Sequence, residues 1–290
     1  MFKIVHKQII AQDIKKIDIS APAIAARALP GQFVMVTPFQ GDDNIPMTII
    51  ESDERRSVIS LLVHEVGLST RKLGDISIGE CIHQIVGPLG LPAQLDKYGL
   101  VICVATGIGA AQILPICRGL KKKGNKIIGI IGAKSKKVLM LESQMRVVCD
   151  EVFITTNDGS YERRGLATEL LKELLNKYTV NRVYAIGSVE MMQSASLMTK
   201  EKGIPLRVTL NPYMVNGLGL CGSCRVKIDG QSRLACVEGP EFDGHQVDYQ
   251  DLSQRMNTLE LRKWENQSPL NLKRPGFAGL VKSLWGSTKK

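Results

Sequence analysis

Short apolar runs separated by Gly, Pro, Asp and Asn fill the first third of the chain. Runs of this length with turn residues between them are typical of strands. The five that carry the pattern are FKIVHKQII, KKIDISAP, GQFVMVTPF, SVISLLVHEV and ECIHQIVGPLG. Many short strands in succession predict a barrel or a sandwich, so we expect an all-β domain over residues 1–97, written here as a β barrel.

The pattern changes near residue 98, where buried-strand runs begin to alternate with helical segments of about 10 to 15 residues. The strand-like runs are GLVICVATG, NKIIGIIGA, EVFITTND, RVYAIGS and LRVTLNP. The helical ones are AAQILPICRGLKKKG, KKVLMLESQMRVVC, GLATELLKELLNKY and EMMQSASLMTKEKG. This alternation predicts βαβ units, and therefore a doubly wound α/β domain with a mostly parallel sheet over residues 98–210.

Residues 211–250 are rich in glycine and turn residues, and they are too few to build an apolar core of their own. They contain three cysteines, and a module of this size needs a cross-link such as a bound metal or cluster to be stable. Residues 251–290 predict a polar helix followed by a basic tail. We expect an apolar stripe in that tail to dock on a partner or on the body of the protein; it consists of Phe277, Leu280, Val281, Leu284 and Trp285.

The overall composition is that of an ordinary globular protein, with 290 residues of which 44% are hydrophobic and 23% charged. The net charge of +10 comes from scattered lysine groups without interleaved aromatic residues. We therefore expect no nucleic-acid ligand and favour docking of an acidic partner. The uncharged run over residues 100–117 contains a glycine turn and Pro115, so we expect no membrane span.

The seven cysteines are an odd number, and no basic-then-apolar leader precedes the first strand. A secreted disulfide framework is therefore not expected, and the sequence favours a cytoplasmic location. Four cysteines occur singly in apolar surroundings, and we expect them to be small buried hydrophobes: Cys81, Cys103, Cys117 and Cys149.

Candidate ligand contacts follow the strands of the α/β domain. In ATGIGAAQ, Gly107 and Gly109 stand between a strand and a helix, where the backbone can approach a pyrophosphate. Asp158 and Gly159 follow a later strand of the same sheet. Ligands of open α/β sheets bind at the carboxyl ends of the strands, which favours one site for all four residues. The alternative is that these glycines only form tight turns.

Two segments of the β domain are candidate contacts for a phosphate and a ring. HEVGLSTRKL offers Gly67, Ser69 and Thr70, whose small side chains, hydroxyls and amides suit a diphosphate. Val63 immediately precedes this segment, and Gly87 lies in the second segment, VGPLGLP. Each segment is also compatible with a simple hairpin turn.

The cysteine pattern points to a cluster. Positions Asn216, Cys221, Cys224 and Cys236 reproduce the plant-type spacing in which a ligand is followed by x4-C-x2-C and a more distant cysteine, as in [2Fe-2S] proteins. The alternatives are a zinc site with His245 as the fourth ligand, or free thiols. Glycines in the loop favour a cluster, because they allow the close backbone approach that it requires.

Taken in this order, the chain resembles the ferredoxin reductase-like flavoproteins that end in a [2Fe-2S] module. It is similar to the small FAD subunit of NADH-dependent reduced ferredoxin:NADP oxidoreductases, also called sulfide dehydrogenase subunit, and to the dihydroorotate dehydrogenase electron-transfer subunit. The segments that carry the resemblance are IPMTI, VGPLGLP, IIGAKSKKVLMLE, TTNDGSYERRG, LNPYMVNGLGLCGSCRV and ACVEGPEFDGHQVDY.

The resemblance implies an oxidoreductase subunit that moves electrons between NAD(P)H, FAD and a [2Fe-2S] cluster toward a larger flavin and iron-sulfur subunit, with an acidic ferredoxin as a further partner. It places Pro46, Met47 and Thr48 at the isoalloxazine and residues 67–70 at the flavin diphosphate. The glycines at 107 and 109 and the Asp158-Gly159 pair then fall at the nicotinamide nucleotide. No side chain is expected to act as an acid or base, because the cofactors carry the chemistry.

The chain departs from these relatives at several positions. Asn44 and Ile45 stand where an arginine precedes the flavin segment, Gln112 replaces a proline, and Asn216 replaces an aspartate ligand of the cluster. Three outcomes are open. Asn216 binds the cluster weakly through its amide oxygen, or a nearby carboxylate such as Asp229 or Glu238 serves as the fourth ligand. In the third, Asn216 deamidates to aspartate because a glycine follows it. The spacing does not decide among these three.

Further alternatives follow from the departures. One is electron transfer to a dihydroorotate dehydrogenase catalytic subunit, and another is a structural or regulatory paralogue that has lost a cofactor. The choice between NADH and NADPH stays open as well. An acidic residue after the second strand of the α/β domain would favour NADH, but GAKSKK offers lysines there, and these either favour a 2′-phosphate or face water.

Overall fold

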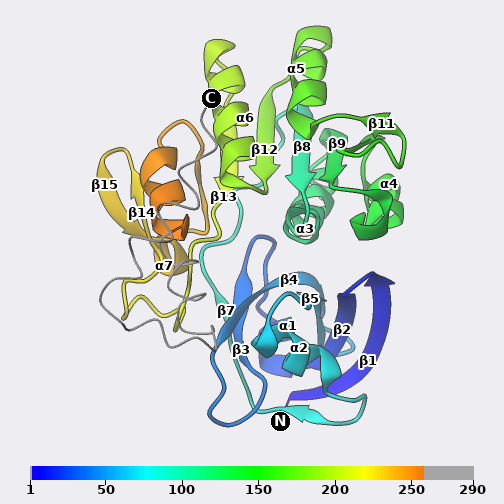
Figure 1. Cartoon of the computed structure of the whole chain (residues 1–290), viewed down its shortest axis with the longest axis vertical. Coiled ribbons are helices and arrows are strands. Elements are labelled where there is room, and N and C mark those ends of the chain that lie inside the picture. The colour runs from blue at the N-terminus through cyan, green and yellow to red at the C-terminus, as the bar shows by residue number, and fades with distance from the viewer. Residues whose placement is uncertain (1, 258–290) are drawn as a thin grey trace, which may run out of the picture.

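The computed structural model describes residues 2–257, and its first part is a curled antiparallel sheet (Figure 1). The strand order is β6-β1-β2-β5-β4-β3-β7. Only His83 separates the two edge strands, so the chain itself links the edges of a nearly closed barrel. The strands are β1 Phe2–Ala11, β2 Ile14–Ser20, β3 Phe33–Thr37, β4 Ile45–Asp53, β5 Val58–His64, β6 Cys81–Ile82 and β7 Gln84–Leu89.

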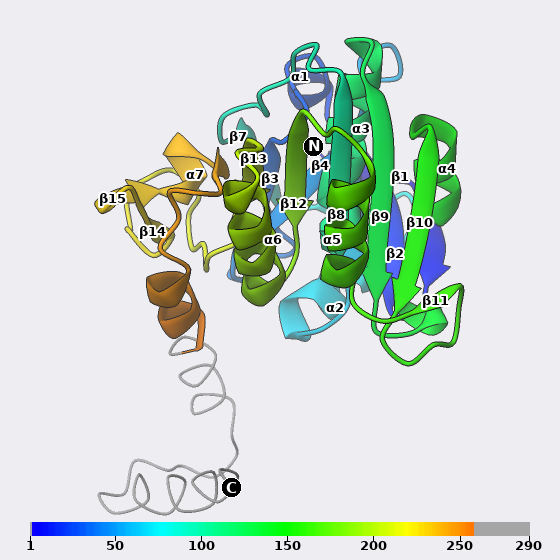
Figure 2. The same cartoon turned by 90° about the horizontal axis from the view of Figure 1, so that it is seen from above.

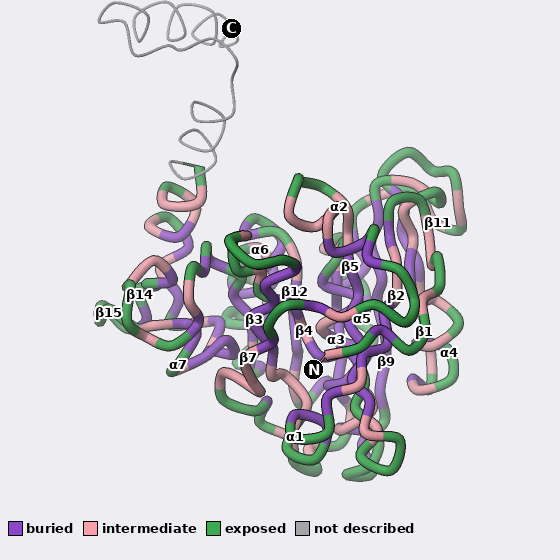
Figure 3. Tube along the Cα trace, turned by 90° about the horizontal axis from the view of Figure 1, so that it is seen from below, coloured by how far each residue is buried: buried purple, intermediate pink, exposed green. Residues whose placement is uncertain are grey.

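The barrel encloses its own apolar core, formed by branched side chains such as Ile17, Val36 and Leu61. Two short helices, α1 (Pro22–Ala25) and α2 (Leu68–Asp75), lie on loops of this domain. Strands β3 and β5 are buried almost throughout, whereas β1, next to the edge strand β6, is mostly exposed or half-buried (Figure 3). The inward-facing side chains fill the barrel, as expected for a small barrel.

The second sheet has the order β11-β10-β9-β8-β12-β13-β16 and is parallel except for the last strand. The chain starts at β8 and adds β9, β10 and β11 toward one edge of the sheet. It then crosses to β12, next to β8, and adds β13 and β16 toward the other edge. The direction in which strands are added therefore reverses between β8 and β12. The strands are β8 Leu100–Thr106, β9 Lys126–Ala133, β10 Glu151–Thr156, β11 Arg163–Arg164, β12 Arg182–Ile186, β13 Leu206–Thr209 and β16 Glu241–Asp243.

Helices cover both faces of this sheet (Figure 2). One buried cluster joins α5 and α6 to one face, and a second joins α3 and α4 to the other. The helices are α3 Gly109–Lys122, α4 Glu142–Val148, α5 Ala167–Lys177 and α6 Val189–Glu201, with a 3-10 turn at Lys136–Val138. The predicted fold class, a β barrel followed by a doubly wound α/β domain, is therefore confirmed.

One predicted helix is shorter than expected. The segment KKVLMLESQMRVVC contains the 3-10 turn and then α4, which starts only at Glu142. Leu141 has a left-handed backbone with φ of 60°, and Met140 and Leu141 are both buried. Anchoring these two side chains in the core interrupts the helix, so local propensity is overridden by packing.

A small module containing the cysteines follows the α/β sheet. It consists of the hairpin β14 (Arg225–Ile228) and β15 (Gln231–Leu234) and the helix α7 (Ala235–Glu238). Its buried residues belong to the same cluster as α5 and α6, which agrees with the expectation that the segment has no core of its own. The chain returns to the sheet through β16, and residues 249–257 are helical.

The remaining expectations can be placed on this fold. Three of the four single cysteines are buried, whereas Cys81 on the edge strand β6 is half-buried. Within residues 2–257, no helix has both the length and the apolar character needed to cross a membrane. The apolar stripe predicted in the basic tail lies outside the described residues.

Candidate flavin, nucleotide and cluster sites

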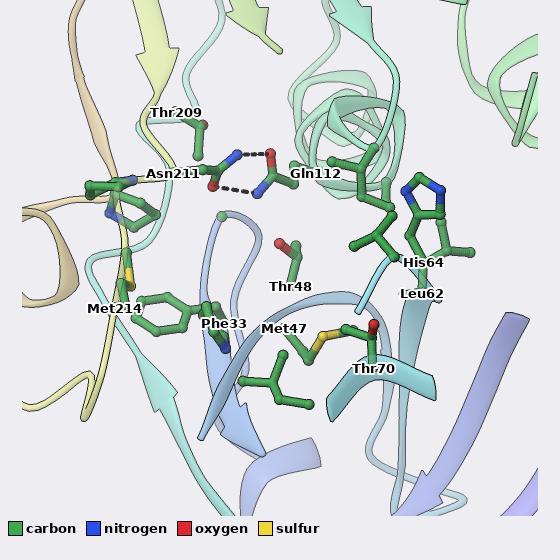
Figure 4. Close-up of a pocket in the computed structure, with 18 residues that line it drawn as sticks. Phe33, Met47, Thr48, Leu62, His64, Thr70, Gln112, Thr209, Asn211 and Met214 are labelled. Atoms are coloured by element: carbon green, nitrogen blue, oxygen red, sulfur yellow. Dashed lines mark hydrogen bonds between the residues drawn. The ribbon is translucent and has the colours of Figure 1, made fainter. Parts of the chain in front are cut away.

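A cavity of about 310 Å³ lies where the barrel, the α/β sheet and the chain leading to the cysteine module meet (Figure 4). Its volume is within the range of small-molecule sites, roughly 300–1,000 Å³. The barrel contributes Pro46, Met47, Thr48, Leu62, His64 and Thr70, the α/β domain contributes Ile108, Ala111 and Gln112, and the connecting chain contributes Asn211, Pro212 and Met214.

The cavity brings together part of the predicted flavin site. Pro46, Met47 and Thr48 lie on β4 and line it, and Thr70 lines it from α2. Figure 4 shows the Thr48 side chain in the middle of this group. An apolar wall with a few hydroxyls suits a flat ring system such as isoalloxazine, so these residues fit the group.

Val63 is placed differently. Side chains alternate along β5, so Leu62 and His64 line the cavity while Val63 is fully buried in the barrel core. Gly87 also has a packing role, because a Cβ there would lie 2.6 Å from Val34 Cγ1. Sequence reasoning missed Leu62 and His64, and the period of two along the strand was the signal that could have found them.

The start of α2 fits the predicted diphosphate contact. Gly67 caps this helix, and its N–H donates to the Thr70 hydroxyl at 3.0 Å. A Cβ added at Gly67 would meet nothing within 4 Å, so the backbone is open to an approaching group. Ser69 lies in the same first turn and is half-buried. Free amides at a helix start favour an anion.

The predicted nucleotide glycines lie at the carboxyl edge of the α/β sheet, next to the reversal of strand order. Gly107 has a φ of +54°, and a Cβ there would face open space. Gly109 opens α3, and its Cβ would lie 2.3 Å from the carbonyl oxygen of Ile186 on β12. The first glycine leaves an open cradle and the second allows close packing, which is the pattern that a pyrophosphate site requires.

Asp158 and Gly159 lie in the loop after β10, at the same edge of the sheet. The Asp158 carboxylate accepts a hydrogen bond from the Ser160 N–H at 2.9 Å. Hydrogen bonds from Ser160 hold the pKa of Asp158 below its ordinary value, so this exposed group is an anion at neutral pH.

A reciprocal amide pair crosses the cavity edge. Gln112 Nε2 donates to Asn211 Oδ1 at 2.8 Å, and Asn211 Nδ2 donates back to Gln112 Oε1 at 2.9 Å (Figure 4). The pair connects α3 to the chain that leads into the cysteine module. Gln112, which stands where the resembling proteins have a proline, thus has a definite partner.

Two of the three cysteines are in contact. Cys224 Sγ and Cys236 Sγ are 3.2 Å apart and buried, whereas Cys221 is exposed with its sulfur 3.1 Å from the Ser223 hydroxyl. Hydrogen bonds from Ser223 lower the pKa of Cys221 to about 7, and burial raises the pKa of Cys236 to about 11. Thiolates are the usual ligands of a [2Fe-2S] cluster, so the chemistry of these donors fits one.

Three of the candidates for the fourth ligand have hydrogen-bond partners of their own. Asn216 Oδ1 accepts a hydrogen bond from the Leu218 N–H at 2.9 Å, so the amide oxygen is engaged by its own loop. The Glu238 carboxylate binds Arg233 and the Leu234 N–H, and His245 Nε2 lies 3.0 Å from the Thr199 hydroxyl. Within the described residues, no three His, Cys, Asp or Glu side chains converge as a metal site.

The cysteine loop is fixed to the barrel near the cavity. Asn44 accepts a hydrogen bond from the Thr37 hydroxyl at 2.6 Å and donates to the Val215 carbonyl at 3.1 Å. A Cβ on Gly217 would lie 2.6 Å from Met35 Cγ on β3, so the loop backbone packs directly on the barrel. Asn44, where the resembling proteins carry an arginine, therefore connects the barrel to the cysteine module.

A barrel and a doubly wound sheet with a glycine turn at its reversal point meet at one cavity, and the chain that lines this cavity leads into a cysteine module. This combination defines a ferredoxin reductase-like electron-transfer protein. Solved structures with this fold agree. The chain matches phthalate dioxygenase reductase with a TM-score of 0.54 at 16% identity, over 83% of this chain and 94% of that one. It matches a chain from the NADH-dependent reduced ferredoxin-NADP oxidoreductase with a TM-score of 0.87 at 33% identity, over 94% and 98%.

Relatives of known family extend the match. Residues 211–248 match the model of the iron-sulfur cluster binding domain of dihydroorotate dehydrogenase B. The chain is 36% identical to a dihydroorotate dehydrogenase B electron transfer subunit homolog of Thermotoga maritima, over 88% of this chain and 90% of the relative. It is 32% identical to the electron transfer subunit of Desulforamulus reducens, over 84% and 96%.

The chain therefore belongs to the family of dihydroorotate dehydrogenase B electron transfer subunits and their homologues. The predicted resemblance is confirmed. Membership also supports the predicted oxidoreductase role and the predicted cofactors, which are FAD, NAD(P)H and a [2Fe-2S] cluster.

Proposed function

We propose that this chain is the electron-transfer subunit of an oxidoreductase complex and moves electrons between NAD(P)H, FAD and a [2Fe-2S] cluster toward a partner subunit. The bound cofactors supply the conversion between hydride transfer and single-electron transfer. The protein supplies binding, orientation and exclusion of water.

The observation that carries this proposal is the meeting of three modules on one cavity. Thr48 of the barrel, Ile108 of the α/β domain and Met214 ahead of the cysteines all line it. The segments proposed to hold a nucleotide and a flavin therefore meet at this cavity, and the chain that leads to the cysteines lines it as well. A binding module without electron transfer would not need this arrangement, because each ligand could then have a separate site.

Each module has a distinct proposed role. The β4 segment and Thr70 orient the flavin ring, and the first turn of α2, which contains Ser69, offers backbone amides to the diphosphate beside the open Cα of Gly67. Gly107 and Gly109 hold the nucleotide pyrophosphate at the start of α3, where the helix dipole favours negative charge. Cys221, Cys224 and Cys236 would hold the cluster through thiolate sulfurs.

The proposed partner is a larger flavin and iron-sulfur subunit of the ferredoxin:NADP oxidoreductase type. The solved structure with the TM-score of 0.87 supports this choice. The net charge of +10 also suits encounter with an acidic ferredoxin, because complementary charge accelerates association in a salt-dependent way. A reducing cytoplasm remains our prediction for its location.

A dihydroorotate dehydrogenase catalytic subunit is the second candidate partner. The match of residues 211–248 and the similarity to the Desulforamulus reducens subunit favour it. Co-expression with each candidate partner, followed by co-purification, distinguishes the two assemblies.

The decisive experiment is anaerobic purification with partner proteins, followed by visible absorbance and quantification of flavin, iron and acid-labile sulfide. We expect flavin and about two irons per chain, with both chromophores bleached by NADH or NADPH. Cys236→Ser should lose the iron and keep the flavin. Cys81→Ser, a thiol on the edge strand of the barrel, is the matched control and should keep both.

Other outcomes separate the alternatives. Flavin without iron would show that the cluster is absent, and zinc without iron would indicate a zinc module. Absence of flavin and iron in the assembled complex would contradict the electron-transfer proposal and favour a structural or regulatory subunit.

A further inference from the structure

One basic side chain faces the cavity that fits the flavin. Of the 18 described residues that line this cavity, His64 is the only one with an acidic or basic side chain, and the others are apolar, glycine, hydroxyl or amide residues. Figure 4 shows the His64 ring on the same side of the cavity as Leu62 and Thr70. A proton transfer to a side chain in this cavity therefore has one candidate.

The end of β5 directs His64 toward the cavity. The next residue, Glu65, is held on the opposite side, because its N–H donates to the Asp13 carbonyl at 2.8 Å and its carboxylate lies 2.6 Å from Lys15 Nζ. Side chains alternate along a strand, so fixing Glu65 on one side fixes His64 on the other. The His64 ring is half-buried, which allows it to contact both the cavity and the solvent.

Both ring nitrogens of His64 are available for a proton. In the part of the chain that the structure describes, neither has a hydrogen-bond or ion-pair partner. His6 Nδ1, by contrast, lies 3.3 Å from Asp18, and His245 Nε2 lies 3.0 Å from the Thr199 hydroxyl. An imidazole without a protein partner can take up a proton on one nitrogen and pass it to water.

The charged groups on the elements packed against this end of β5 are mostly paired with one another. They are Asp13 and Lys15 of the β1–β2 hairpin, Glu65 after β5, and Arg71, Lys72 and Asp75 of α2. Lys15 pairs with Glu65 and Asp75, and Lys72 pairs with Asp42. The two that form no ion pair within residues 2–257, Asp13 and Arg71, have opposite charges. Charge of a single sign therefore does not surround the imidazole.

Electron transfer of the proposed kind leaves a proton behind. Oxidation of NAD(P)H breaks a C–H bond of the nicotinamide and yields NAD(P)⁺, two electrons and one proton. The bound flavin converts this hydride transfer into single-electron steps. A [2Fe-2S] cluster accepts the electrons without the proton, so one proton per nucleotide must pass to another group.

We propose that His64 is a catalytic base that accepts this proton as the electrons leave for the cluster. The inference rests on the proposed function, because it concerns the same electron transfer. The nucleotide is oxidised and the cluster and partner are reduced, while the proton forms an N–H bond on the imidazole, from which water removes it. This role departs from the sequence-based prediction that no side chain acts as an acid or base.

His64→Gln in the complex purified with its partner tests this role, and His83→Gln is the matched control. His83 is an exposed histidine of the same barrel and does not line the cavity. Stopped-flow absorbance separates flavin bleaching by NADH or NADPH from electron passage to ferricyanide, which accepts single electrons.

We expect His64→Gln to leave the rate of flavin bleaching unchanged, because hydride transfer needs no base. Reduction of ferricyanide at pH 7 should slow by at least about tenfold, less than the roughly 10²–10⁴-fold of a typical general base because water can partly replace a half-exposed ring. His83→Gln should change neither rate.

Two readouts exclude a merely structural effect. Added imidazole should restore ferricyanide reduction in His64→Gln and leave the wild-type rate unchanged, because a free base can enter the half-exposed site. NMR spectra of the full chain labelled at its four histidines need no turnover. The signal that is missing in His64→Gln should shift when FAD is added to flavin-depleted protein, whereas the His83 signal should stay in place.

Four results would overturn the proposal. They are equal ferricyanide rates in the wild type and His64→Gln, an equal loss in His83→Gln, a loss that imidazole does not restore, and a His64 signal that does not move while FAD binds. With any of these, flavin bleaching by NADH or NADPH leaves the proposed function intact. Absence of bleaching in the wild-type complex would overturn the proposed function and the role of His64 together.

Discussion

Gly217→Ala tests whether the cysteine loop is held in place by its packing on the barrel. Gly217 has a φ of +72°, and an added Cβ would lie 2.6 Å from Met35 Cγ and 3.0 Å from Leu89 Cδ1. Met35 is only 2% exposed, and Cγ is not the free end of its side chain. The barrel therefore cannot make room without moving β3 or displacing the loop.

The expected loss of stability has two parts. A left-handed backbone costs a residue with a Cβ about 1–2 kcal/mol. Forcing a methyl group into a filled site adds about 1–3 kcal/mol. Gly217→Ala should therefore lower the free energy of unfolding by about 2–5 kcal/mol, and a displaced loop should also retain less iron.

Gly230→Ala separates these two parts. Gly230 lies in the turn between β14 and β15 with a φ of +71°, and its added Cβ would meet nothing within 4 Å. It has the same backbone cost as Gly217 without the steric overlap. The difference between the two variants measures the contact with the barrel, expected to be about 1–3 kcal/mol.

The assay combines urea denaturation with iron quantification on anaerobically purified protein. Equal unfolding free energies and equal iron contents in Gly217→Ala and Gly230→Ala would refute the reasoning, because the loop would then not depend on Met35. Unequal stability with equal iron would limit the contact to a structural role.

Three further predictions address other parts of the molecule. Gln112→Leu and Asn211→Leu should show a coupling energy of about 0.5–1.5 kcal/mol in a double-mutant cycle measured by urea denaturation. Additive losses of unfolding free energy would show that the two amides do not stabilise each other. Gly109→Ala should weaken 5′-AMP binding by at least about tenfold, because its methyl group would overlap the Ile186 carbonyl 2.3 Å away; unchanged calorimetric affinity would argue against this site. Burial raises the pKa of Glu241, although Arg207 Nε lies 2.9 Å from Glu241 Oε1. The folded state therefore holds the proton of this carboxyl group more tightly than the unfolded state does. Protonated Glu241 therefore stabilises the fold at low pH, and this contribution is lost as the pH rises above about 4.5. Glu241→Gln should reduce the dependence of the unfolding free energy on pH above this value. An unchanged slope in the variant would contradict the role of Glu241.

Much of the fold could be predicted from the sequence because the patterns reflect local physics. Strand β8 is apolar from Leu100 to Ala105, because helices cover both faces of its sheet. The spacing of the cysteines identified the cluster module for a similar reason, because short loops limit where thiolates can be placed.

The elements that could not be predicted depend on distant contacts. The break before α4 arises from the burial of Met140 and Leu141, which the helical pattern does not reveal. The strand β4 also escaped the strand pattern, because Pro46 near its start reads as a strand breaker. The structure accommodates this proline in the β3–β4 pair, opposite Met35.

The same limit applies to the candidate site. Gln112 and Asn211 are 99 positions apart, and no spacing rule connects them. His64 faces the cavity only because the alternation of β5 turns Val63 into the barrel core. A motif can indicate the segment that contacts a ligand. Which side chains of that segment face the ligand depends on the register of the strand, and the closed sheet fixes this register.

The contacts around the cysteine loop explain how a module without its own core can be positioned accurately. Asn44 and Met35 hold the loop from the barrel, and Asn211 holds its approach from α3 through Gln112. These residues stand on or beside the cavity that also fits the flavin. Because the same contacts shape the cavity and anchor the loop, a change at Asn44 should alter flavin binding and iron retention together. Independent ligand sites would not show this coupling.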